Sequence, residues 1–254
     1  MTDAPPRAAL VTGASTGIGR AIAIAFGALG WRVALGARRE PVLAETATMV
    51  EDAGGTAVVR VLDVADAASI DACWDASEAA IGPIDVLVNN AGISRPGALH
   101  EMSDDDHAEI LATNLLGPIL VTKRFVRARL ASGGAGDIVF VSSDAVHHPR
   151  PHLLTYGASK AGLDCVSRTL ALEVEGTGIR STIVRVGPTL TSAGDDWDPA
   201  VFETLLPRWQ HFGLQRHWAT MLPDDVARAV VAAVTMPAHA HVPEIEVQPV
   251  APSE

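Results

Sequence analysis

The chain has 254 residues and is 48% hydrophobic, so it can bury a sizeable core as one or two domains and is too apolar for a disordered protein. It carries 30 acidic against 19 basic residues, which gives a formal net charge of −11. This balance argues against a nucleic-acid-binding protein and against docking on an anionic membrane, because both need clustered Lys and Arg.

Apolar segments of strand length alternate with helical patterns along the chain. We predict strands at residues 8–12, 32–37, 57–62, 85–89, 137–142, 180–186 and 244–247. We predict helices at residues 17–29, 40–52, 66–80, 103–130, 155–175 and 223–236. The helix at 103–130 should have Ser103 as its N-cap, with Asp106 three residues later, and should bend at Gly117-Pro118.

Short strands that are apolar throughout and separated by helices are typical of parallel strands covered on both faces. We therefore predict an α/β fold: one Rossmann-like, doubly wound parallel sheet of about seven strands with helices on both faces. Residues 1–254 should form a single dinucleotide-binding and catalytic domain. In such a fold the carboxyl ends of the strands share one edge, where ligands bind.

A glycine-rich turn follows the first predicted strand, with the sequence Thr-Gly-Ala-Ser-Thr-Gly-Ile-Gly at residues 12–19. Glycines at this place let backbone N–H groups approach a pyrophosphate, whose charge is stabilised by the N-terminus of the next helix. A tight strand-to-helix turn without a ligand would need the same glycines. The position near the N-terminus, after a strand and before an amphipathic helix, favours the ligand-binding interpretation.

The end of the second strand bears on the choice of dinucleotide. A carboxylate about 20 residues beyond the glycines usually binds the ribose 2′-hydroxyl of NAD. This chain instead has Arg38 and Arg39, whose guanidinium groups can bind a 2′-phosphate. We therefore predict that NADP(H) is preferred and that NAD(H) is possible. The alternative is a solvated arginine pair at the start of a helix.

Polar residues also follow the third and fourth strands. Asp63, before Val64, can accept from an adenine amino group, or it can cap a helix or a turn. Asn90, in the segment Asn-Asn-Ala-Gly that ends at Gly92, suits either a close approach to a ligand or an Asx turn.

The only tyrosine of the chain, Tyr156, lies four residues before Lys160, one of only two lysines. On a helix these side chains project from one face, and a nearby ammonium stabilises a phenolate and lowers its pKa from about 10. Ser143 precedes the tyrosine by thirteen residues, at the end of the fifth strand. The alternative is a surface tyrosine on an amphipathic helix.

These motifs, together with Asn114 in the long helix, resemble the short-chain dehydrogenases/reductases, and in particular their compact branch of about 250 residues. The match is collinear from about residue 7 to 248. The resemblance implies that Tyr156 is the general acid/base and that Lys160 binds the nicotinamide ribose and lowers the pKa of the tyrosine. It implies that Ser143 bonds the substrate oxygen and that Asn114 supports a water-mediated proton path behind Lys160.

The resemblance also assigns cofactor contacts. It places the pyrophosphate among Gly13, Ser15, Ile18 and Gly19, and the adenosine beside Asp63, Val64 and Asn90, with Gly92 near the cofactor. Gly187 and Thr191 keep the spacing of a loop that contacts the nicotinamide amide, although Val186 stands where the family usually has proline. Thr16 stands where NADP-preferring members often carry a basic residue, so the NADP(H) prediction depends on Arg38 with help from Arg39.

The implied function is hydride transfer between nicotinamide and a secondary alcohol or ketone, by an alcohol dehydrogenase or carbonyl reductase. One alternative is a cofactor-binding regulatory or scaffold protein with the same fold and no turnover. A second is an enzyme of this fold that epimerises or dehydrates its substrate and recycles the cofactor. The resemblance further suggests a homotetramer, or a dimer, paired through the helices that begin near Ser103 and Thr155.

Residues 189–222 should cover the substrate, and they hold five of the ten Trp and Phe residues. These are Trp197, Phe202, Trp209, Phe212 and Trp218. Their number favours an apolar substrate, with Leu153 and Leu154 in the same pocket, although they could simply pack a helical lid on the core. His147, His148 and His152 precede the tyrosine without acids or thiols at ligand spacing, so we expect no metal site.

The remaining sequence signals concern location. The longest stretch without a formal charge, residues 229–243, is too short to span a bilayer, and we expect no signal peptide. Cys73 and Cys165 make no disulfide framework, and we expect small buried side chains in a protein of the reducing cytoplasm.

Overall fold

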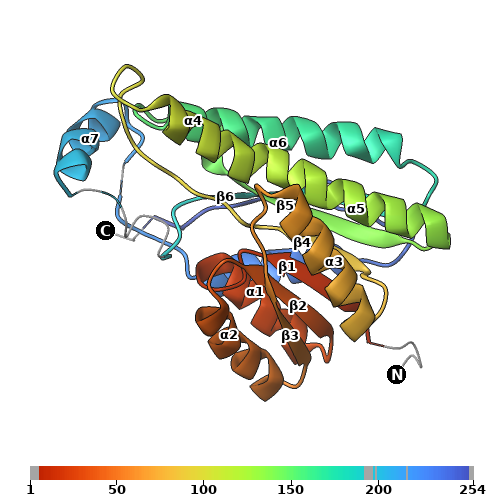
Figure 1. The fold of residues 1–254 in the computed structure, drawn as a ribbon. Coiled ribbons are helices and arrows are strands. Elements are labelled where there is room, and N and C mark those ends of the chain that lie inside the picture. The colour runs from red at the N-terminus through yellow and green to blue at the C-terminus, as the bar shows by residue number, and fades with distance from the viewer. Residues whose placement is uncertain (1–5, 192–196, 198, 216, 252–254) are drawn as a thin grey trace.

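The seven-stranded sheet runs through the middle of the molecule (Figure 1). The computed structural model describes residues 6–191, 197, 199–215 and 217–251, and within them all strand pairs are parallel, in the order β3-β2-β1-β4-β5-β6-β7. The strands are β1 (Ala8–Thr12), β2 (Arg32–Ala37), β3 (Thr56–Val61), β4 (Val86–Asn89), β5 (Gly136–Ser143), β6 (Ile179–Val186) and β7 (Glu244–Val247). The predicted doubly wound parallel sheet is confirmed.

Helices cover both faces of the sheet (Figure 1). They are α1 (Gly17–Ala28), α2 (Glu40–Asp52), α3 (Ala67–Ile81), α4 (Asp104–Leu111), α5 (Gly117–Ser132), α6 (Leu154–Glu173), α7 (Pro199–His211) and α8 (Pro223–Val234). Helices α1, α2 and α8 pack on one face, and α3, α5 and α6 pack on the other. The β7 strand forms one edge of the sheet, beside β6.

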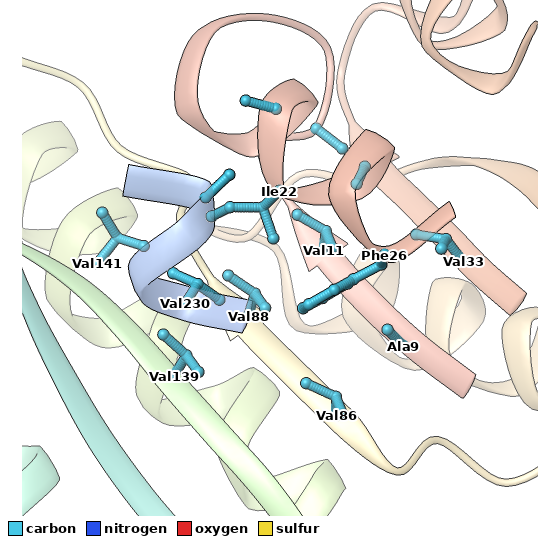
Figure 2. Close-up of a cluster of buried hydrophobic side chains, with 14 of the residues drawn as sticks. Ala9, Val11, Ile22, Phe26, Val33, Val86, Val88, Val139, Val141 and Val230 are labelled. Atoms are coloured by element: carbon cyan, nitrogen blue, oxygen red, sulfur yellow. The ribbon is translucent and has the colours of Figure 1, made fainter. Parts of the chain in front are cut away.

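Two apolar cores follow from the alternation of side chains along each strand. On β1, Val11 points to the face that α1 and α8 cover, where it joins Ile22, Phe26 and Val230 (Figure 2). Leu10, its neighbour, belongs to the opposite core. Because both faces of β1, β4 and β5 are buried, the sequence shows continuous apolar runs there, and these strands lie between two helical layers.

The long helix predicted at 103–130 is divided by an irregular turn. It consists of α4, one π-helical turn called η1 (Ala112–Leu116), and α5. Ser103 is the N-cap as predicted, since its Oγ accepts from the backbone N of Asp106 at 3.1 Å. The break lies just before Gly117-Pro118, because Pro118 has no N–H to continue the ladder and Gly117 N bonds to Ala112 O, five residues back.

Two further observations concern the burial of the two cysteines and the apolarity of the helices. Cys73 is buried as predicted, whereas Cys165 is exposed, because it lies on the face of α6 that points away from the core. Within the described residues, no helix combines the length and the apolarity that a bilayer crossing requires.

Candidate active site

The residues predicted to bind a ligand lie where the strands end. Because all the strands are parallel, their carboxyl ends meet at one edge of the sheet. The glycine turn follows β1, Arg38 follows β2, Asp63 follows β3, Asn90 follows β4, Ser143 ends β5 and Gly187 follows β6. The topology therefore gathers segments that are up to about 170 residues apart in the chain.

The turn between β1 and α1 needs glycine for steric reasons. Gly13 has a φ of +66°, and a Cβ there would lie 2.8 Å from Asn90 Nδ2. A Cβ on Gly19 would collide with the carbonyl oxygen of Gly13. Helix α1 begins directly after this turn and has no acidic residue in its first turn, so its positive end is available to an anion. This cradle fits a pyrophosphate.

Asn90 supports the glycine turn from the neighbouring strand. Its Nδ2 donates to Thr12 O at 3.1 Å and to Gly13 O at 3.2 Å. The hydroxyl of Thr12 in turn accepts from the backbone N of Asn90 and of Ala91, both at 3.0 Å. The amide nitrogen of the Asn90 side chain thus fixes the path of the turn. Thr12 also helps to fix the turn, a role that was not predicted from the sequence.

We expect Gly19→Ala to damage this turn, because the added methyl group forces the backbone of Gly13 to move. The free energy of unfolding should fall by about 1–3 kcal/mol, as for other overpacked sites, and NADPH binding should weaken. Thermal unfolding with and without NADPH measures both effects. Ala28→Ser, at the exposed end of α1, is the control and should change neither. An unchanged melting curve for Gly19→Ala would show that the turn relaxes around the methyl group.

The two arginines after β2 lie beside the glycine turn. The backbone N of Ala14 donates to Gly36 O at 3.2 Å, which ties the turn to the end of β2. Arg38 and Arg39 are exposed, and neither side chain has a hydrogen-bond or ion-pair partner within the described part of the chain. Their guanidinium groups are therefore available to an anion next to the turn.

The segment after β3 presents mainly backbone to this edge. Asp63 Oδ1 accepts from the backbone N of Ala65 at 2.9 Å, which makes it a turn acid, one of the two roles left open by the sequence. The side chain of Val64 is buried in the core that includes α3 and α5. Of the two, only Asp63 has a polar side chain to offer a ligand.

Tyr156 and Lys160 come from the first turns of α6, as their spacing predicts. The Nζ of Lys160 lies 5.8 Å from the centroid of the Tyr156 ring and donates to Val141 O at 2.9 Å. Ser143 lies beside the Tyr156 hydroxyl and acts to lower its pKa. The three polar groups thus meet where β5 and α6 adjoin.

The pKa of the Tyr156 hydroxyl is raised, whereas a lowered pKa was expected. Burial raises it above its ordinary value of 10.0, the hydrogen bond with Ser143 opposes this effect, Asp144 raises it further and Arg150 lowers it. Burial lowers the pKa of Lys160 to about 8, and Asp164 acts in the opposite sense. In the protein by itself desolvation outweighs the nearby charges, and the acidifying effect of Lys160 stays a prediction.

Asn114 lies in the π turn and links two segments of the site. Its Oδ1 accepts from the backbone N of Ile93 at 2.8 Å, and its Nδ2 donates to Ile93 O at 2.8 Å and to Ser159 Oγ at 3.2 Å. A Cβ on Gly92 would lie 3.5 Å from Lys160 Nζ, so the glycine leaves space beside that ammonium. The side chain of Asn114 is fully bonded and positions the chain next to Lys160 and Gly92.

The loop after β6 closes the site toward α1. Gly187 N donates to Val247 O at 2.9 Å, which anchors the loop on β7 although Val186 replaces the usual proline. A groove of about 500 Å³ lies between this loop and α1, and Thr16, Gly17, Leu190 and Thr191 are among its lining residues. The groove therefore joins the glycine turn to Thr191, as one ligand along this edge requires.

Residues 7–201 match the family model described as short chain dehydrogenase. The chain belongs to the short-chain dehydrogenase family. It is 39% identical to a D-threitol dehydrogenase of Mycolicibacterium smegmatis over 230 residues, which cover 89% of this chain and 84% of the relative.

Solved structures agree over almost the whole chain. An alcohol dehydrogenase from the archaeon Thermococcus sibiricus, complexed with 5-hydroxy-NADP, has a TM-score of 0.83 at 27% identity and covers 98% of this chain and 99% of its own. A variant of the actinorhodin polyketide ketoreductase with NADPH has a TM-score of 0.82 at 33% identity and covers 96% of each chain. Hydride transfer by an oxidoreductase of this family fits the site, whereas nothing supports a scaffold without turnover.

The aromatic residues after β6 separate into two groups in this short-chain dehydrogenase. Trp209 of α7 packs with Leu205 and Leu153, and Tyr156 and Trp197 pack against them. Phe212 and Trp218 are each 63% exposed, and Phe202 is at the border of exposure. Leu154 is also exposed and is not part of this cluster, so its predicted place in the substrate pocket stays a prediction. Residues 192–196, 198 and 216 of the predicted covering segment lie outside the described residues.

The indole N–H groups fix α7 over the dehydrogenase site. Trp197 Nε1 donates to Ser94 O at 3.1 Å, and Trp209 Nε1 donates to Pro151 O at 3.1 Å. In Figure 1, α7 accordingly lies beyond the starts of α4 and α6. An apolar surface is thus held against one side of Tyr156.

Two of the three histidines before the tyrosine have side-chain contacts, with different partners. His147 Nδ1 lies 3.2 Å from Glu246 Oε2, and His152 Nε2 lies 3.1 Å from Arg208 Nη1. Among the residues that the structure describes, no group of three His, Cys, Asp or Glu side chains could hold a metal ion.

Sequence reasoning missed Asp144 and Arg150 of this dehydrogenase. The two side chains form an ion pair next to Ser143 and both act on the pKa of Tyr156. Five residues lie between them, and this segment belongs to no predicted helix or strand, so no periodicity predicts the contact. A charged residue directly after Ser143 was the only available signal.

Proposed function

We propose that this short-chain dehydrogenase interconverts secondary alcohols and ketones with NADP(H), as an alcohol dehydrogenase or carbonyl reductase. The observation that carries the proposal is the convergence of Ser143, Tyr156 and Lys160 at the edge of the sheet that also holds the glycine turn. Two hydroxyls and an ammonium next to a pyrophosphate cradle suit proton transfer beside a bound dinucleotide.

The residues divide into those that hold the dinucleotide and those that act on the substrate. Bound there, the dinucleotide supplies or accepts the hydride. Gly13, Ser15, Thr16, Ile18 and Gly19 hold the pyrophosphate, Arg38 and Arg39 the 2′-phosphate, Asp63, Val64 and Asn90 the adenosine side, and Gly187 and Thr191 the nicotinamide side, with Gly92 near the cofactor.

Three side chains carry the acid–base chemistry. Tyr156 gives a proton to the substrate oxygen in reduction and removes it in oxidation. Ser143 donates a hydrogen bond to the same oxygen and stabilises its developing charge. Lys160 holds the ribose hydroxyls, and Asn114 keeps the segment beside Lys160 in place for a water-mediated proton path.

The preference for NADP(H) is supported by charge at one position. A 2′-phosphate carries charge that a ribose hydroxyl lacks, and Arg38 is an exposed cation two residues beyond Gly36, which bonds to the glycine turn. Two solved relatives were determined with NADPH or an NADP derivative. A carboxylate that would repel the phosphate is absent from residues 37–39.

The substrate side favours an apolar compound. Leu153, Leu205 and Trp209 form a buried cluster against Tyr156, so the substrate meets hydrocarbon and aromatic surface near the reacting oxygen. Cyclic or long-chain ketones bury more apolar area there than short polyols do.

We expect Trp209→Ala to weaken substrate binding selectively. The change removes a 6% exposed ring that packs edge-to-face on Trp197 and Phe202, with ring centroids 6.4 and 6.5 Å apart. The KM for an apolar ketone should rise about tenfold, while the Kd for NADPH stays the same. Trp218→Ala, which removes a 63% exposed ring of the same segment, is the control. An unchanged KM would mean that the cluster only packs α7.

The proposed function is tested by cofactor binding followed by turnover. NADPH and NADH are titrated separately, and the preferred one is assayed with 2-octanone, 1-tetralone and a tetritol by the absorbance of reduced nicotinamide. We expect tighter binding of NADPH and faster turnover of the two apolar ketones. Tight NADH binding with negligible NADPH binding would reject the cofactor assignment, and no net change in absorbance would reject net redox chemistry on these compounds.

The assembly and the location stay predictions. A homotetramer, or a dimer, through the helices that begin near Ser103 and Thr155 would cover Leu111, Leu116 and Ile119, which are exposed on α4, η1 and α5. Light scattering of the purified protein measures the assembly. A cytoplasmic location agrees with two cysteines that form no disulfide.

A further inference from the structure

A bidentate ion pair closes the loop that follows Ser143. Arg150 Nη1 donates to Asp144 Oδ1 at 2.9 Å, and Arg150 Nη2 donates to Asp144 Oδ2 at 2.8 Å. The side chain of Asp144 is only 7% exposed and that of Arg150 only 11%. A buried ion pair of this kind is weak grounds for stability, because desolvating both charges offsets their attraction. Its position beside the reacting hydroxyls indicates another role.

The ion pair contacts Ser143 directly. The Ser143 hydroxyl donates to Asp144 Oδ1 at 3.3 Å and accepts from the backbone N of Ala145 at 3.1 Å. A serine hydroxyl has one proton, so Asp144 competes for it with a substrate oxygen. Arg150 binds both oxygens of the carboxylate and thereby weakens this competition. Without Arg150, the carboxylate would hold the proton of Ser143 more strongly.

The same two charges face Tyr156, from the loop after β5. Asp144 raises the pKa of the Tyr156 hydroxyl and Arg150 lowers it, so the two effects oppose each other. Lys160 lies on the same helix as Tyr156, and its Nζ is 5.8 Å from the centroid of the Tyr156 ring. Helix α7 presents the apolar side chains of Leu205 and Trp209. Helix α4 presents His107, whose Nδ1 lies 2.5 Å from Thr155 Oγ1. Among the described residues, the charged groups that act on the pKa of this phenol are Asp144 and Arg150.

We propose that Asp144 and Arg150 are positioning residues for the two active-site hydroxyls: they direct the proton of Ser143 and balance the charge that Tyr156 faces. This inference rests on the proposed function, in which those hydroxyls act on the substrate oxygen. Neither residue needs to contact the substrate. Arg150 acts through Asp144, and Asp144 acts through Ser143 and through its field at Tyr156.

The ionisation of Tyr156 can be measured without a substrate, because Tyr156 is the only tyrosine among the 254 residues. The ultraviolet absorbance of the phenolate is titrated in the wild type, Asp144→Asn, Arg150→Met and the double variant, with Tyr156→Phe as the blank. Asp144→Asn should titrate about one pH unit lower than the wild type, since a neutral amide leaves Arg150 uncompensated. Arg150→Met should titrate higher, and the double variant should return near the wild type.

A kinetic measurement follows the proton of Ser143. With the panel ketone that reacts fastest, Arg150→Met should lower kcat about tenfold without changing the KM for NADPH, and the double variant should recover most of the loss. A purely structural role would change the melting temperature and leave the phenolate titration of each folded variant in place.

The controls separate the possible failures. Arg124→Met breaks exposed contacts with Asp71 and Asp75 on α3 and should titrate like the wild type. All titrations are limited to the pH range in which far-ultraviolet circular dichroism stays native. If Arg150→Met does not fold, Asp144→Asn and the double variant still decide the question, because neither contains an unpaired carboxylate.

An Asp144→Asn midpoint that coincides with the wild type, or lies above it, would overturn the inference. If the protein reduces the ketones but all variants titrate at the same pH as the wild type, the role of the ion pair is rejected and the proposed function stands. Shifted titrations in a protein that turns over no ketone would support the charge balance at Tyr156 and reject the proposed function.

Discussion

Tyr156→Phe should lower kcat for ketone reduction about 10³-fold while the affinity for NADPH stays within about twofold of the wild type. The change removes the one hydroxyl that can exchange a proton with the substrate oxygen and keeps the ring that packs against Leu153 and Trp209. Steady-state kinetics with the fastest panel ketone measures kcat, and fluorescence titration measures NADPH binding. Thermal unfolding should be nearly unchanged, because the ring and its apolar contacts remain.

The neighbouring Leu154→Ala is the matched control for this variant. Leu154 is 56% exposed and lies two residues before the tyrosine on α6, so its removal tests whether any change in that turn impairs the enzyme. We expect near-normal activity. A Tyr156→Phe protein that keeps a substantial part of the wild-type kcat would contradict the role of the phenol as general acid/base.

Arg38→Asp should reverse the cofactor preference. The variant replaces an exposed cation after β2 with a carboxylate, which repels a 2′-phosphate and accepts from the ribose 2′-hydroxyl of NADH. Charge-assisted hydrogen bonds of this kind contribute about 1.5–3 kcal/mol, so the Kd for NADPH should rise about 100-fold and that for NADH should fall. Calorimetric titration with both dinucleotides measures the change.

Two further arginine variants complete this test. Arg39→Ala should weaken NADPH binding less than Arg38→Asp, because Arg39 occupies the N-cap position of α2 and is the secondary candidate. Arg228→Ala removes a cation from a side chain that is 82% exposed on α8 and should leave both affinities unchanged. Unaltered NADPH binding by Arg38→Asp would show that the 2′-phosphate does not contact Arg38.

Local sequence signals were sufficient to predict the strands, the helices other than α7, and most of the candidate site residues. The apolar runs of β1, β4 and β5 predict buried parallel strands because both faces of each strand are covered. The spacing of Tyr156 and Lys160 predicts a common helix face, and α6 has that face. These inferences depend only on residues that are near one another in the chain.

Other features arise from contacts between segments distant in sequence. The side chain of Asn90 bonds to the β1 turn, 77 residues away at Gly13, which no local pattern could indicate. The π turn at Asn114 meets both Ile93 and Ser159. The pKa of Tyr156 rises because the fold removes the hydroxyl from water, and burial cannot be read from a four-residue spacing.

The amino-acid sequence by itself determined the strand and helix pattern, the family, and the edge of the sheet where the candidate residues gather, because periodicity, glycine turns and helix spacing are local properties of the chain. Only the tertiary structure decided that Asp144 and Arg150 join beside Ser143, that Trp197 and Trp209 belong to the cluster beside Tyr156 while Phe212 and Trp218 are exposed, and that desolvation raises the pKa of the phenol. These outcomes depend on burial and on contacts between side chains that are far apart in the chain. Both arise only when those distant segments pack together.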